Sequence, residues 1–103
     1  MKIVPRPIQF EWDKGNAGKN YDKHKVTNQE CEEAFFDPKK KMFKDILHSG
    51  EEERHLLLGK TKLARTLFIA FTIRGNRVRV ISARDLNKKE LALYEEKNHR
   101  AKI

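Results

Sequence analysis

The sequence predicts an α+β fold, in which an antiparallel meander of about four strands packs against two N-terminal helices and one C-terminal helix. Three observations support this. Runs rich in β-branched and aromatic residues flank Gly75-Asn76, helix-capping signals stand at Thr27 and Asn87, and the predicted strands follow one another in the chain. With 103 residues in all, residues 1–103 are expected to form a single domain.

The hairpin of residues 65–84 is the predicted centre of the sheet. Gly75 and Asn76 tolerate the positive φ that a two-residue turn requires. The run 67–71 is apolar on both faces, which is typical of a central strand. The run after the turn alternates, which predicts Val78, Val80 and Ser82 on one face and Arg77, Arg79 and Ile81 on the other.

The segment before the hairpin predicts two short helices. Residues 8–12 resemble a short strand, and Asp13 is the expected N-cap of a polar helix that continues through His24. Its expected inward positions are Ala17, Asn20, Tyr21 and His24.

A second helix is expected to begin at Thr27, because Glu30 follows at the capping-box spacing. It presents Cys31, Ala34 and Phe35 on one face and ends before Pro38.

The remaining elements are two strands and a last helix. Residues 42–47 and 54–61 are expected strands, joined by a polar loop over 48–53. Asn87 and Glu90 are spaced as a cap and its partner, and the helix they begin is expected to bury Leu91 and Tyr94.

The positive charge is concentrated on the hairpin. Residues 60–89 hold nine Lys and Arg against one acid, a net charge of +8 that equals the net charge of the whole chain. A field of this kind attracts nucleic acid or an acidic protein surface. The plain structural alternative is a solvated strand edge that resists aggregation.

The amino-acid composition limits the cellular location and the metal or cofactor chemistry that we expect. The single cysteine cannot form an internal disulfide, and no apolar stretch approaches a membrane span, so we expect a cytoplasmic protein without membrane association. Neither a glycine-rich phosphate loop nor a metal-ligand spacing is present; the four histidines are scattered. We therefore expect no metal and no cofactor. Cys31, on an apolar helix stripe, is expected to serve packing.

The residue types that remain suit cleavage of RNA without a metal. Such cleavage needs a base, cations that stabilise the charge at phosphorus, and an acid. Arginine suits the second role because its planar fork pairs with phosphate oxygens. The arginines of interest are Arg54, Arg65, Arg74, Arg77, Arg79 and Arg84.

Proton transfer and base stacking have their own candidates. His24, Glu52 and Glu53 are candidates for proton transfer, and Lys23 for phosphate binding. Each has a structural alternative: a helix-face histidine, or a solvated acidic loop. Trp12 and Tyr21 are the aromatics on which a base can stack, although a lone tryptophan is often a core residue.

The order and spacing of several short motifs resemble the BrnT toxins. The first half carries Phe10-Glu11-Trp12-Asp13, Asn20, Lys23-His24, Glu33-Ala34 and Phe36-Asp37-Pro38. The second half carries Glu52-Glu53-Arg54, Thr72-Ile73-Arg74-Gly75, Ile81-Ser82-Ala83-Arg84 and Lys89-Glu90. One departure is Lys25, where the family has glycine after Lys-His.

This resemblance implies a RelE-like fold and a metal-independent endoribonuclease that inhibits translation. It implies neutralisation by a BrnA-like antitoxin in a heterotetramer, with DNA bound only through the antitoxin. It places Arg74 and Arg84 first among the catalytic candidates, followed by His24, Glu53 and Lys23. The expected RNA-binding residues are Trp12, Arg54, Arg65, Arg77, Arg79 and Lys88.

The guanidinium groups of the two paired strands are expected to converge on one patch that fits a scissile phosphodiester. Two functions are alternatives to an RNA-cleaving toxin. One is a basic module that binds nucleic acid or an acidic partner without catalysis, and the other is an inactive toxin kept for antitoxin binding.

Overall fold

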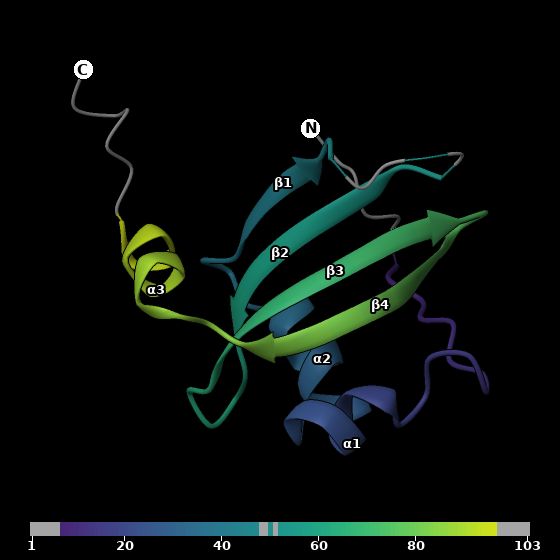
Figure 1. The fold of residues 1–103 in the computed structure, drawn as a ribbon, viewed down its shortest axis with the longest axis horizontal. Helices are drawn as coiled ribbons and strands as arrows, with labels where there is room; N and C mark the ends of the chain where they lie inside the picture. The colour runs from purple at the N-terminus through teal and green to yellow at the C-terminus, as the bar shows by residue number, and fades with distance from the viewer. Residues whose placement is uncertain (1–6, 48–49, 51, 97–103) are drawn as a thin grey trace.

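The computed structural model describes residues 7–47, 50 and 52–96, and confirms the α+β meander (Figure 1). The strands form one antiparallel sheet in the order β1-β2-β3-β4. The elements are α1 Lys19–His24, α2 Asn28–Phe35, β1 Lys41–Asp45, β2 Arg54–Lys60, β3 Thr66–Arg74, β4 Arg77–Asp85 and α3 Lys88–Glu95.

The sheet has two unlike faces. On the inner face, alternate residues of β3 and β4 form the core with α2, and Phe35 of α2 makes an edge-on ring contact with Phe71 at 4.9 Å between centroids. Gly59 of β2 passes so close to α2 that a Cβ there would lie 2.6 Å from the Ala34 carbonyl oxygen. The outer face, which points away from α1 and α2, carries Phe68, Ala70 and Thr72 of β3.

The predicted alternation along β4 is correct only for its first half. Phe71 pairs with Val80 but Ala70 pairs with Ser82, so Ile81 is an extra residue in β4. Such a bulge reverses which side chains face inward beyond it. Ser82 is therefore exposed, and Ala83 is buried in the core instead.

The helix predicted from Asp13 through His24 is confirmed over Lys19–His24, and its first half is wrong. Residues 14–18 form turns, and α1 begins after Gly18. Gly18 has a φ of 79°, a left-handed conformation that does not fit inside a continuous α-helix. Asn16 holds the turn, since its amide donates to the carbonyls of Glu11 and Val80 at 2.9 and 3.0 Å. Of the expected inward residues only Asn20 is buried; Ala17, Tyr21 and His24 are exposed.

The second helix is confirmed in detail. Thr27 and Glu30 form a reciprocal capping box, and Cys31, Ala34 and Phe35 are fully buried. Burial raises the pKa of the Cys31 thiol to about 12, which agrees with a packing role. Before this helix, Lys25 adopts a left-handed conformation with φ 57°, the conformation that glycine adopts most easily.

The segments at the two ends of the described chain, residues 8–12 and α3, pack against the sheet. Val78 of β4 accepts the backbone N–H of Glu11 and donates its own N–H to the carbonyl of Gln9, both at 2.8 Å. The expected strand over residues 8–12 is therefore reduced to one bridge, between Phe10 and Val78. At the other end of the chain, α3 has the predicted capping box of Asn87 and Glu90. Its Tyr94 is buried and Leu91 is partly buried.

No helix in the described part of the chain combines the length and apolar character that crossing a membrane requires.

Candidate nucleic-acid interface

A row of arginines lies along the outer face of the β3–β4 hairpin. Arg84 is opposite Phe68, and its guanidinium carbon lies 4.2 Å from the centre of that ring. Arg79 is opposite Thr72, and Arg74 ends β3 on the same face. Because the bulge at Ile81 reverses the alternation, it brings Arg84 to the same face as Arg79. The row runs the length of the hairpin.

The expectation that Arg74 and Arg84 converge on one phosphodiester is wrong. Arg74 pairs with Arg77 next to the turn, whereas Arg84 pairs with Phe68 near the start of β3. Six residues of strand separate Phe68 from Arg74, or about 20 Å. The two guanidinium groups therefore cannot hold the same phosphate; the two-residue turn at Gly75-Asn76 sets this register.

At the turn end of the row, carboxylates hold two arginines. Arg74 pairs with Glu52, with Nε 2.7 Å from the nearer carboxylate oxygen. Arg79 makes a two-pronged contact with Asp13 at 2.8 and 3.1 Å. Hydrogen bonds from these arginines lower the pKa values of Glu52 and Asp13, so both carboxylates are ionised at neutral pH. Glu11 lies farther from Arg79, at 3.6 Å.

At the opposite end, Glu90 orients Arg84. Both terminal nitrogens of Arg84 donate to the Glu90 carboxylate at 2.8 Å. Glu90 also belongs to the capping box of α3, so the guanidinium is fixed between β4 and the start of that helix. Hydrogen bonding to Arg84 lowers the pKa of Glu90.

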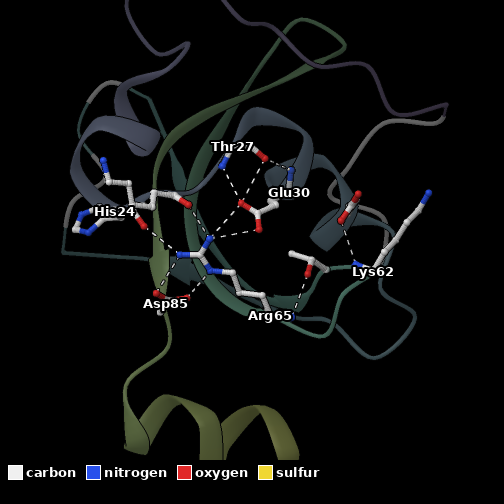
Figure 2. Close-up of polar contacts among 9 residues, drawn as sticks. His24, Thr27, Glu30, Lys62, Arg65 and Asp85 are labelled. Atoms are coloured by element: carbon white, nitrogen blue, oxygen red, sulfur yellow. Dashed lines mark hydrogen bonds and ion pairs between the residues drawn. The ribbon is translucent and has the colours of Figure 1, made fainter.

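Arg65 lies on the inner side of this end and all its donors are used within the protein (Figure 2). It donates to Asp85 at 2.7 and 3.1 Å, and to Glu30 at 3.2 and 3.3 Å. It also donates to the carbonyls of Lys25 at 2.7 Å and His24 at 3.0 Å. An RNA contact by Arg65 would require breaking this network.

The same end carries three exposed basic side chains that the sequence singled out. Lys23 and His24 form the last turn of α1, and Lys88 begins α3. His24 lies close enough to Asp85 for its positive form to help lower the pKa of that carboxyl, after the larger effect of Arg65. His24 and Arg84 thus flank the end of β4 from opposite sides.

The remaining predicted residues lie elsewhere. Trp12 packs against the core and its indole donates to Glu32 at 2.8 Å, which agrees with the structural alternative. Glu53 pairs with Lys44 at 2.9 Å, and this hydrogen bond lowers its pKa. Arg54, at the start of β2, helps lower the pKa of Glu52, and Arg77 is exposed at the hairpin turn.

Sequence reasoning did not assign the carboxylates that hold the arginines. Asp13 was read as a helix cap and Glu90 only as a capping partner, although each contacts an arginine of the row. Asp13 and Arg79 are 66 residues apart in the sequence, and Glu52 and Arg74 are 22 residues apart. No local sequence pattern can therefore link either carboxylate to its arginine.

The described residues contain no cluster of three or more His, Cys, Asp or Glu arranged to hold a metal ion. His48 and His99, two of the four scattered histidines, lie outside the described residues.

Comparisons with known proteins agree with the motif resemblance. A search of the curated proteins found no sequence match. The family model described as "Ribonuclease toxin, BrnT, of type II toxin-antitoxin system" matches residues 12–90, a segment that includes the whole sheet and the arginine row. The family implies a protein antitoxin as partner and RNA as target. The chain belongs to the BrnT family of ribonuclease toxins of type II toxin–antitoxin systems.

Proposed function

We propose that this toxin is a metal-independent endoribonuclease that binds RNA along the outer face of the β3–β4 hairpin. The observation that carries the proposal is the alignment of Arg84, Arg79 and Arg74 on one face over about 20 Å. That length exceeds the span of a single nucleotide. The row can therefore contact several phosphates of a single RNA.

We assign the chemical step to the Arg84 end. Arg84 is held in a fixed orientation by Glu90, and a preorganised cation stabilises the charge that develops on a phosphate in the transition state. His24 lies at the same end, and histidine is the side chain best suited to moving protons near neutral pH. Lys23 and Lys88 are exposed there and supply further positive charge.

The turn end then serves RNA binding. Glu53, the other candidate base, is paired with Lys44, and its lowered pKa makes it a weak proton acceptor at neutral pH. Arg74, Arg77 and Arg79 are better placed to hold the RNA away from the reacting bond, and Arg54 extends the same surface onto β2. We assign Arg65 a structural role, because all its donors are used within the protein.

The biological setting of the proposal follows from the family resemblance. Cleavage takes place in the cytoplasm and inhibits translation. A BrnA-like antitoxin neutralises the toxin in a heterotetramer of two toxins and two antitoxins, and contributes the DNA contacts that regulate the operon.

The experiment is an RNA-cleavage assay with purified toxin in EDTA. The wild type is expected to cut single-stranded RNA, and Arg84→Ala to lose about 100-fold in kcat. Lys39→Ala removes a positive charge from the turn before β1, away from the hairpin, and is the matched control. Intact RNA with the wild type, or an Arg84→Ala variant as active as Lys39→Ala, would refute the assignment.

One observation favours a second candidate, a basic module that binds an acidic partner without catalysis. Arg74, Arg79 and Arg84 are each already paired with a carboxylate, and arginine forms the same two-pronged contact with carboxylate as with phosphate. In that case RNA stays intact, while an acidic protein competes with RNA for the same arginines.

A further inference from the structure

A groove separates α2 from the turn that joins β2 to β3. It encloses about 590 Å³, which is within the range of sites that bind a ligand or an anchoring side chain. One wall is the outer side of α2 and the residues after it, with Glu33, Phe36 and Asp37; the other wall is residues 60–62. Phe36 is 63% exposed although its neighbour Phe35 is fully buried.

The groove has fixed walls. The Glu33 carboxylate accepts the backbone N–H of Lys62 at 3.1 Å, and Asp37 accepts the N–H of Lys60 at 2.8 Å. Asp37 also accepts the Tyr94 hydroxyl of α3 at 2.5 Å. These bonds tie the two walls together, so a partner would find the groove already formed and lose little affinity to ordering it.

The α2 wall is the acidic part of a basic protein. From residue 27 to residue 38 there are four acidic residues and no Lys or Arg, whereas the whole chain has a net charge of +8. Hydrogen bonds lower the pKa of Glu33, and at Asp37 they outweigh the opposing effect of burial and lower its pKa also. Both carboxylates are therefore ionised at neutral pH, and they face the wall that carries Lys60 and Lys62.

We propose that this groove is an anchoring site for the antitoxin, which inserts an apolar side chain beside Phe36 and places Lys or Arg residues along the acidic α2 wall. An exposed aromatic side chain in a formed pocket is the usual centre of a protein interface. The groove lies on the α2 side of the sheet, away from the arginine row. The antitoxin can therefore hold the toxin here whether or not RNA occupies the outer face.

The inference rests on the antitoxin partner that the family implies and does not depend on the assignment of the cleavage chemistry. The test measures binding of the purified cognate antitoxin to toxin variants by calorimetry. Phe36→Ala is expected to raise Kd at least 10-fold, and Phe36→Arg to raise it further because it adds positive charge facing the basic partner. Leu47→Ala removes another exposed apolar side chain, which follows β1 and is 90% exposed, and is the control.

Each outcome decides something different. Antitoxin that binds Phe36→Ala as tightly as wild type, or that loses as much affinity with Leu47→Ala, would overturn the groove assignment while leaving the toxin–antitoxin pair intact. Failure of the wild type to bind the antitoxin would overturn both. Cleavage of RNA by free Phe36→Ala is expected to equal that of the wild type; reduced cleavage would place Phe36 in the RNA site instead.

Discussion

Arg79 and Arg84 are five residues apart in β4, yet they project from the same face of the sheet. In a regular strand an odd separation places two side chains on opposite faces. The extra residue Ile81 removes this difference, and Arg84 consequently lies over Phe68 on the outer face. Bulges often re-aim a functional side chain in this way. Here the bulge makes a continuous row of arginines out of residues that would otherwise be divided between the core and solvent.

The two ends of this row are expected to act independently. Arg84→Ala should lower kcat about 100-fold, because it removes charge stabilisation in the transition state. Arg74→Ala should raise KM about 10-fold with little change in kcat, because it removes a contact made equally in the ground state. Since the residues are about 20 Å apart, the double variant should show the sum of the two free-energy effects within about 0.5 kcal/mol.

Steady-state kinetics on one fluorescent RNA measures all four proteins of this cycle. Coupling well above that limit would mean that the RNA brings both arginines to one phosphate. Circular dichroism of each variant checks that the fold is retained.

Arg65→Ala is expected to destabilise the protein. The change removes the arginine partner of Asp85 and Glu30 and the side-chain donors to the His24 and Lys25 carbonyls. Loss of this partly buried set of hydrogen bonds and ion pairs lowers the free energy of unfolding by about 2 kcal/mol. For a chain of this size that corresponds to a fall of about 10 °C in Tm.

Thermal denaturation followed by circular dichroism measures the change. Arg77→Ala deletes the same charge at the exposed hairpin turn and is expected to move Tm by about 2 °C or less. Equal Tm values for the two variants would show that the Arg65 network does not stabilise the fold, and would reopen an RNA-binding role for this residue.

The Arg65–Asp85 pair also predicts a dependence of stability on pH. The hydrogen bond from Arg65 lowers the pKa of Asp85 in the folded state. A depressed carboxyl pKa contributes stability above the unfolded value of about 3.9, and this contribution disappears as the pH falls through the folded pKa. Tm should therefore fall below about pH 4, and Asp85→Asn should show a smaller fall than wild type between pH 6 and pH 3.

Asp22→Asn changes the same type of charge on the exposed surface of α1 and is the control for that series. An acid-induced fall in Tm that is identical in wild type and Asp85→Asn would assign the effect to other carboxylates, such as Asp37.

Local sequence signals predicted the elements whose determinants are local. The capping boxes of Thr27 and Asn87, the apolar stripe of Cys31, Ala34 and Phe35, and the turn at Gly75 depend on residues a few positions apart. The first half of the first predicted helix is wrong because Gly18 has a left-handed φ and a long-range bond from Asn16 stabilises a turn instead. Such bonds have no local signature.

The candidate site was predicted by residue type and not by arrangement. The charge on the hairpin showed where the arginines are, and the motif resemblance selected Arg74 and Arg84. Their separation depends on strand register, and the face of Arg84 depends on the bulge at Ile81. Alternation in the sequence gives the faces of a regular strand, but an added residue shifts every later position.

Releasing Arg74 from its carboxylate partner is expected to strengthen RNA binding. Glu52 and a phosphate compete for the same guanidinium, and the Arg74–Glu52 pair is solvent-exposed, so it is weak enough for RNA to displace. Glu52→Gln removes this competitor, and Kd for single-stranded RNA should fall about threefold at low salt. Glu95→Gln deletes the same charge on α3, away from the hairpin turn, and should change Kd less. Fluorescence anisotropy at several salt concentrations separates the causes, because one additional phosphate contact releases counterions and steepens the log–log salt dependence by about 0.7. An unchanged Kd and slope in Glu52→Gln would show that the RNA does not reach Arg74, and would restrict the interface to the end of the hairpin that carries Arg84.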